Sequence, residues 1–197
     1  MILNKKFTLR ALIVFSAILL ICVTALLLIV YYWAPEAELR GIALSDSTLP
    51  VSVTVYGRGA NTISARIVFY SADGNVLNTL ERSWPGWEIT IDAVLAGTGS
   101  GWIVFPLTVL TDETRSGKGV SITRYYNKTG FPALYDTSRV TTHERNALKR
   151  LFALARTESW MPVALGSLYH TQATLRDFET GVEYFLFVGK SGSLSFR

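Results

Sequence analysis

Two histidines, His143 and His170, are the side chains best suited to proton transfer, because imidazole changes its charge near neutral pH. With a serine or an aspartate beside it, either histidine would act as the base of a hydrolase. The sequence contains no GxSxG elbow, no Ser-x-x-Lys spacing and no HExxH motif to accompany them. The carboxylates are scattered, and Asp112 and Glu113 are merely adjacent, so the spacing predicts no catalytic acid pair.

The run GTGSG at 97–101 has the composition of a phosphate-binding loop. Such a loop needs a strand before it and a helix after it, so that backbone amides point at the anion. Here GWIVFPLTVL follows, and this apolar run predicts a strand. We therefore expect a hairpin connection at 97–101, and no cofactor.

Trp84 and Trp87 bracket the turn Pro85-Gly86, and turns lie on protein surfaces. Tryptophan is favoured both in β-sheet cores and at binding surfaces. We expect most aromatic residues to lie in the core, and we single out Trp84 and Trp87 as a possible surface contact.

Cys22 is the only cysteine of the chain. The rest of the chain therefore cannot contain a disulfide, a cysteine-ligated zinc ion or a cysteine nucleophile. The sequence predicts no metal site and identifies no small-molecule ligand. It does not decide whether Cys22 carries a lipid.

The segment that contains Cys22, residues 11–33, has 23 residues without a charge or a proline. As a helix it is about 34 Å long, which is enough to cross a bilayer. Lys5, Lys6 and Arg10 precede it, and basic residues stay on the cytoplasmic side. The sequence therefore predicts an uncleaved signal anchor with a cytoplasmic N-terminus. A cleaved signal peptide is the alternative, although its apolar region is usually shorter.

Four parts are expected: a basic tail at 1–10, the anchor at 11–33, a tether at 34–50 and a periplasmic or extracellular domain at 51–197. Sixteen basic and fifteen acidic residues follow residue 33, so the outer part is almost neutral. This balance argues against binding to nucleic acid.

The outer domain is expected to have an α+β fold, mainly antiparallel, with six to nine strands and one packed amphipathic helix. The helix is predicted at 141–157, where Thr141 and Glu144 form a capping box. Alternation and turn residues predict strands at 51–57, 62–70, 76–82, 87–93, 102–111, 119–127, 164–170, 171–178 and 182–188.

These features favour a membrane-anchored binding or scaffold protein of the cell envelope, which contacts the membrane through its anchor and another envelope protein through its domain. The alternative is a membrane-tethered envelope hydrolase that uses Ser or Asp with His143 or His170. The absence of a catalytic motif favours the first hypothesis over an enzyme.

Overall fold

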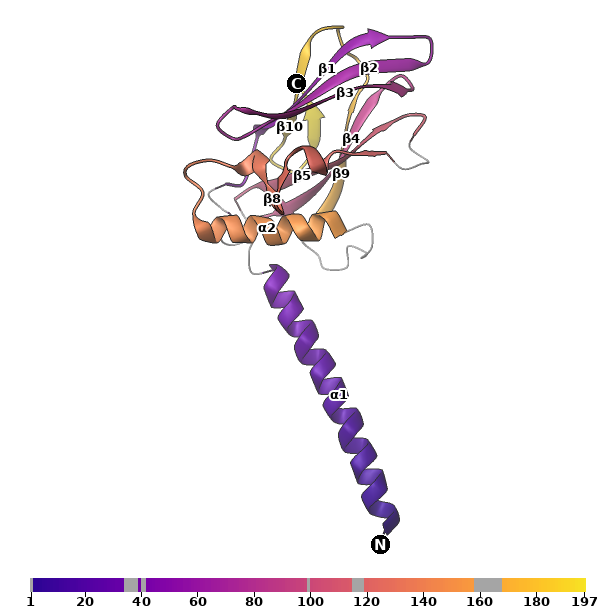
Figure 1. Ribbon diagram of the computed structural model, residues 1–197, viewed down its shortest axis with the longest axis vertical. Helices are drawn as coiled ribbons and strands as arrows, with labels where there is room; N and C mark the ends of the chain where they lie inside the picture. The colour runs from indigo at the N-terminus through magenta and orange to yellow at the C-terminus, as the bar shows by residue number, and fades with distance from the viewer. Residues whose placement is uncertain (1, 34–38, 40–41, 99, 115–118, 158–167) are drawn as a thin grey trace. The chain divides into compact units, whose positions relative to one another are not determined.

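The computed structural model describes residues 2–33, 39, 42–98, 100–114, 119–157 and 168–197. The chain divides into two units, Met1–Ala34 and Pro35–Arg197. The first unit is the helix α1 (Ile2–Trp33), and every side chain described in it, from Leu12 to Leu28, is exposed (Figure 1). Within the part of the chain that the structure describes, no helix is both long and apolar enough to cross a membrane.

The second unit contains two antiparallel sheets and a short hairpin. The five-stranded sheet has the order β11 (Leu194–Phe196), β10 (Glu183–Val188), β1 (Ser47–Arg58), β2 (Thr62–Tyr70) and β3 (Val76–Pro85). The four-stranded sheet has the order β6 (Val120–Ser121), β5 (Trp102–Thr111), β4 (Ile89–Gly97) and β9 (Leu168–Leu175). The hairpin pairs β7 (Asn127–Lys128) with β8 (Phe131–Pro132). With the helix α2 (Thr142–Thr157), these sheets confirm the predicted α+β class.

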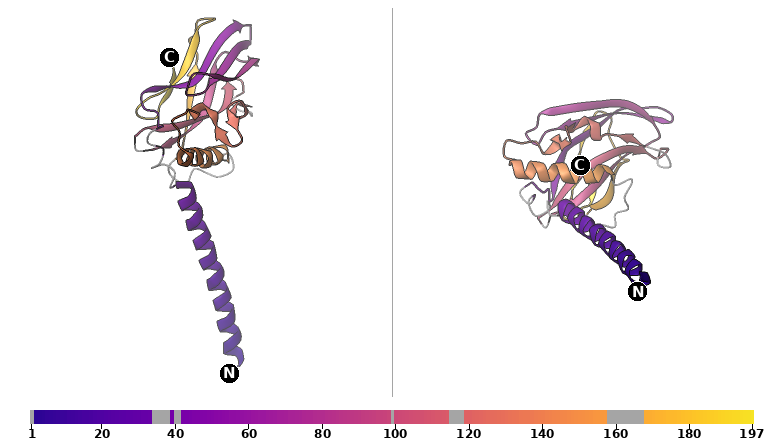
Figure 2. Two further views of the ribbon diagram at one scale, coloured as in Figure 1. Left: turned by 60° about the vertical axis from the view of Figure 1, so that its left-hand side comes forward. Right: turned by 60° about the horizontal axis from the view of Figure 1, so that its bottom comes forward.

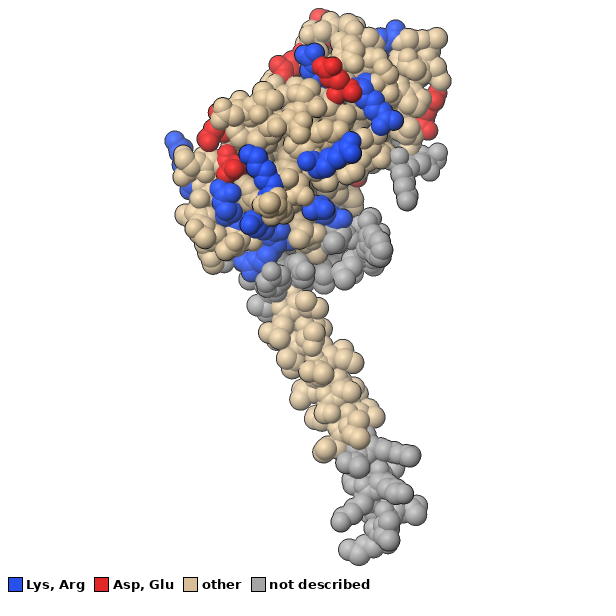
Figure 3. Space-filling view, viewed as in Figure 1, with Lys and Arg blue, Asp and Glu red and all other residues tan. Residues whose placement is uncertain are grey.

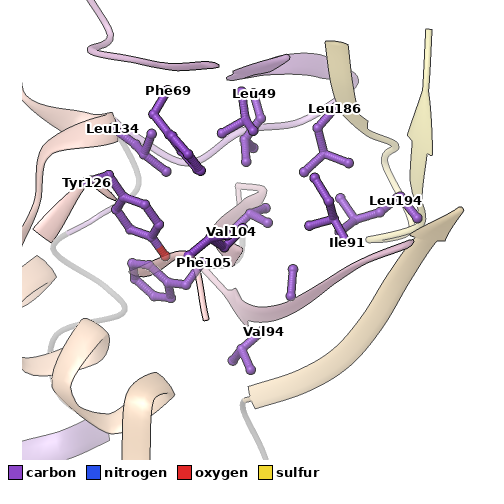
Figure 4. Close-up of a cluster of buried hydrophobic side chains, with 14 of the residues drawn as sticks. Leu49, Phe69, Ile91, Val94, Val104, Phe105, Tyr126, Leu134, Leu186 and Leu194 are labelled. Carbon is purple, nitrogen blue, oxygen red and sulfur yellow. The ribbon is translucent and has the colours of Figure 1, made fainter. Parts of the chain in front are cut away.

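The core lies between the two sheets and follows from the alternation of side chains along their strands. Val51 and Val53 of β1 stand opposite Phe69 and Ile67 of β2, so all four share one face of the five-stranded sheet. All four are fully buried, as is Ile91 of β4 in the other sheet. Figure 4 shows side chains from both sheets meeting in this cluster.

Helix α2 covers the far side of the four-stranded sheet from β1, β2 and β3 (Figures 1 and 2). The predicted capping box is confirmed: the Glu144 amide donates to Thr141 Oγ1 at 3.3 Å, and the Thr141 amide donates to Glu144 Oε2 at 2.8 Å. Phe152 on the buried face of the helix lies 5.5 Å from the ring of Phe105 in β5. The apolar stripe of α2 therefore packs on β5.

Two buried tyrosines complete the outer edge of β5, which β6 pairs only at Thr108 and Val109. The Tyr135 hydroxyl accepts from the Val104 amide at 2.7 Å and donates to the Val104 carbonyl at 2.9 Å. The Tyr126 hydroxyl donates to the Pro106 carbonyl at 2.6 Å. Burial raises the pKa of both hydroxyls. The tyrosine hydroxyls thus make the hydrogen bonds to backbone groups of β5 that a longer β6 would otherwise make.

The predicted strand at 119–127 is wrong over most of its length. Only β6 is paired with β5, and the 3₁₀ turn η2 (Thr123–Tyr125) follows it. The physical reason is Pro106, which has no amide to donate, together with a register shift beside it between β4 and β5. The chain leaves the ladder there, and Tyr126 reaches back with its side chain.

Two further boundaries differ from the expectation. One strand, β9, runs through His170 and Thr171, where two strands were predicted to meet; residues 164–167 lie outside the described residues. The predicted tether at 34–50 also enters the domain, since β1 begins at Ser47 and both Leu39 and Leu49 are fully buried. Isolated apolar residues in a polar stretch carry no periodicity, and so the sequence pattern did not reveal this burial.

Candidate functional site

Trp84 and Trp87, the predicted surface pair, have different environments. Trp84 ends the core face of β3 opposite Ile63, and only 2% of its surface is exposed. Trp87 lies beyond the turn and is 46% exposed. Trp84 is therefore a core residue and offers no surface contact, whereas Trp87 presents its ring to solvent.

The turn that carries Trp87 is fixed by the end of β5. Asp112 Oδ1 accepts hydrogen bonds from the Trp87 amide at 2.8 Å and the Glu88 amide at 3.3 Å. Thr111 Oγ1 donates to the Pro85 carbonyl at 2.6 Å. Gly86 has a φ of +115°, and a Cβ there would lie 2.4 Å from Asp112 Oδ1, so only glycine fits. Asp112, one of the scattered carboxylates for which the sequence predicted no acid pair, thus holds this turn.

Trp87 is one of three residues that we name the Trp87 cluster: Arg58, Trp87 and Phe178. The Arg58 guanidinium carbon lies 4.9 Å from the Trp87 ring centroid and 5.6 Å from that of Phe178. The cluster joins the end of β1, the turn after β3 and the loop after β9. It forms an exposed cation–π arrangement on a fixed turn.

A second candidate is a polar row on the α2 side of the four-stranded sheet. Gln172 of β9 stands opposite Asp92 of β4, Asp92 opposite Thr108 of β5, and Thr108 opposite Ser121 of β6. Residues directly opposite each other in a sheet share a face. The register shift beside Asp92 marks a bulge, and bulges redirect side chains near functional sites.

The row borders a pocket of about 380 Å³ at the C-terminal end of α2. We name it the polar pocket, and its lining residues are Asp92, Leu107, Thr108, Ser121, Thr123, Ala155, Arg156 and His170. Asp92 Oδ1 accepts from Gln172 Nε2 at 3.2 Å, and Asp92 Oδ2 lies 3.8 Å from His170 Nδ1. The Asp92 side chain is 19% exposed and that of His170 is 47% exposed.

The hydroxyl groups of the polar pocket and His170 come from different elements of the fold. His170 is on β9 and Ser121 on β6, so three strand spacings of about 4.8 Å separate their backbones. Thr108 is two spacings away, and a serine or threonine nucleophile must be within about 3 Å of its base. The structure thus brings His170 next to Asp92, whereas the serine and threonine hydroxyls of the pocket come from other elements than β9.

The other predicted features are distributed elsewhere. His143 is exposed in the first turn of α2 and does not line the polar pocket. The run at 97–101 connects β4 to β5 as a hairpin, and the Thr98 amide donates to the Gly101 carbonyl at 2.9 Å. In the described residues, no group of three His, Cys, Asp or Glu side chains could hold a metal ion.

Sequence reasoning did not find Arg58 and Phe178, because cation–π partners come from segments about 30 and 90 residues away from Trp87. It also gave no sign that Asp92 lies beside His170, since the two residues are far apart in the sequence. No protein-family model matches the chain, and comparisons with curated proteins and with solved structures gave no match.

Proposed function

We propose that the chain is a single-pass membrane protein with a cytoplasmic N-terminus, whose periplasmic or extracellular domain binds or scaffolds another protein of the cell envelope. The anchor rests on the uncharged 23-residue run at 11–33 and on Lys5, Lys6 and Arg10 before it. Exposed apolar side chains such as Leu20, which is 68% exposed, favour a non-aqueous surrounding for α1.

The observation that carries the binding role is the Trp87 cluster. Tryptophan and arginine dominate the energy of protein interfaces, where a few residues account for most of the affinity. Asp112 and Thr111 hold the turn of Trp87, so binding needs little further ordering of its backbone. An exposed aromatic ring on a fixed turn is thus suited to contact a partner protein.

The anchor and its orientation can be tested because Cys22 is the only cysteine. In a Cys22→Ala background, Thr180→Cys places a thiol in the exposed turn before β10. When any outer membrane or wall is made permeable and the cytoplasmic membrane stays intact, a membrane-impermeant maleimide should label this thiol. The protein should also stay in the membrane fraction when it is extracted with alkaline carbonate. If the thiol is labelled only after the cytoplasmic membrane is lysed, the proposed orientation is wrong. If carbonate extracts the protein, residues 11–33 do not anchor it in the membrane.

The partner can be sought by chemical crosslinking in native membranes, followed by purification of the tagged full-length protein and mass spectrometry. We expect one stoichiometric envelope protein, and at least tenfold lower recovery with Trp87→Ala, as for a residue that contributes about 2 kcal/mol to binding. Tyr169→Ala is the matched control, since Tyr169 is an aromatic residue of similar exposure, 52%. Equal loss in both variants would argue against the Trp87 cluster as the interface.

The hydrolase alternative has one favourable observation, the approach of His170 Nδ1 to Asp92 Oδ2 at 3.8 Å. His170→Asn keeps a polar side chain and removes the base. A binding protein should retain its crosslinked partner in this variant, whereas a hydrolase should lose its cellular function even though the partner is still recovered.

A further inference from the structure

We propose that the polar pocket binds a small carboxylate that also carries hydroxyl groups, such as a sugar acid. The inference rests on the charge, the hydrogen-bonding groups and the size of a pocket that is distinct from the Trp87 cluster. It goes beyond the proposed scaffold role, because it assigns the domain a small-molecule ligand.

One side chain of the pocket, Arg156, can receive an anion. Asp92 Oδ2 lies 3.8 Å from His170 Nδ1, so these two side chains face each other on the wall of the pocket. Arg156 is exposed at the end of α2, and no carboxylate of the described residues is within ion-pair distance of it. Its guanidinium lies 5.6 Å from the ring of Phe152 in the same helix. Figure 3 shows that basic side chains also predominate on the surface around α2.

The hydrogen-bonding groups favour a ligand with hydroxyls. Thr108 and Ser121 supply hydroxyls from neighbouring strands, and Thr123 adds a third, with its Oγ1 at 3.3 Å from Ser121 Oγ. Adjacent strands space these groups by about 4.8 Å, close to the distance between alternate hydroxyls of a sugar ring. A carboxylate such as Asp92 accepts hydrogen bonds from hydroxyl groups, and hydroxyl side chains both donate and accept.

The shape of the pocket is built into the fold. A volume of about 380 Å³ lies at the small end of the range for ligand sites and suits a single sugar unit. The small side chain of Ala155 in α2 lines the pocket, and so does Thr108, which stands opposite Asp92 beside the bulge between β4 and β5. Burying most of a carboxylate is costly, and Gln172 stabilises Asp92 in place.

The experiment uses the full-length protein in detergent and titrates glucuronate by calorimetry. Glucose, which lacks the carboxylate, and glucosamine, which carries a positive charge, are the matched probes. We expect glucuronate to bind at least tenfold more tightly than either, because only its carboxylate can accept a charge-assisted hydrogen bond from Arg156. Absence of glucuronate binding, or equal binding of the three sugars, would overturn the proposal.

Variants then locate the binding site. Arg156→Gln should weaken glucuronate binding at least tenfold, and Ser121→Ala should weaken it less. The control is Lys149→Gln, which should leave binding unchanged, because Lys149 is also in α2 but does not line the pocket. Unaltered affinity in Arg156→Gln would show that the sugar acid binds elsewhere. If Arg156→Gln does not fold, the same test is made with Asp92→Asn, which should change the preference between glucuronate and glucose.

Discussion

Aromatic side chains serve two regions of this domain in opposite ways. Along the outer edge of β5, Tyr126 and Tyr135 are buried and their hydroxyls bond to the backbone of the strand. In the Trp87 cluster the ring is exposed, and its partner is the guanidinium of Arg58. In the first region, side-chain hydrogen bonds replace the strand pairing that is missing. In the second region, a large ring stays in solvent, where it adds little to the stability of the folded chain.

The difference is sharpest across one turn, where Trp84 and Trp87 lie three residues apart. Their exposed fractions of 2% and 46% come from the backbone between them. Residues three apart on a strand lie on opposite faces, so the spacing already separates the two rings, and Gly86, at a φ of +115°, turns the chain between them from β3 toward β4. The spacing and this one turn thus decide which of the two rings is buried and which is exposed.

The largest expected effect is on Trp84. Trp84→Ala should lower the free energy of unfolding by about 3–5 kcal/mol, because it leaves a cavity in the core. Trp84→Phe should cost less, since the buried indole N–H has no acceptor in the described residues and its removal relieves an unsatisfied donor. Trp87→Ala should lower the free energy of unfolding by only about 1 kcal/mol, because it removes an exposed ring and its cation–π contact with Arg58 and leaves no cavity. Denaturant unfolding of the three variants measures this order, and a Trp87→Ala loss equal to that of Trp84→Ala would contradict the comparison.

A smaller effect is expected at the edge of β5. Tyr135→Phe keeps the ring but leaves the amide and the carbonyl of Val104 without their partner. The free energy of unfolding should fall by about 1–3 kcal/mol, the cost of leaving buried polar groups unpaired. Hydrogen exchange of the Val104 amide should become faster in the variant. Unchanged protection there would mean that another group replaces the hydroxyl.

The same edge predicts a loss of stability at alkaline pH. Burial raises the pKa of Tyr126 and Tyr135 in the folded chain above the ordinary 10.0, so the folded state holds protons that the unfolded state releases. Their contribution is complete below pH 10.0 and is lost progressively as the pH rises toward the folded pKa values. Unfolding measured at increasing pH should show this decline, and it should be weaker in the double variant Tyr126→Phe with Tyr135→Phe.

The sequence predicted the parts of the fold that local pattern determines. The α2 capping box and the alternation of β1 and β2 depend on neighbours within a few residues, and both predictions are confirmed. The segment 119–127 alternates like a strand, but Pro106 in a distant strand removes the donor that would pair with it. Leu39 and Leu49 are buried by contacts with segments that no local pattern identifies.

The candidate sites were less predictable, because each is assembled across strands. Trp87 was found from its turn, but its partner Arg58 comes from another hairpin. His170 was identified from its residue type, but its approach to Asp92 depends on the pairing of β4 with β9 in one register. A shift of one residue in that register would turn His170 to the other face of the sheet.

The smallest expected effect on stability, and the one that separates the two regions most cleanly, is at Arg58. Arg58→Ala removes an exposed cation–π contact and should lower the free energy of unfolding by about 0.5–1 kcal/mol. Arg124→Ala is the matched control, because the Arg124 guanidinium also lies 4.9 Å from a ring, that of Tyr125. Both variants should unfold at similar denaturant concentrations, yet only Arg58→Ala should reduce capture of the crosslinked partner. Equal capture by the two would leave Trp87 without a functional neighbour, and the exposed ring would then be a feature of the turn alone.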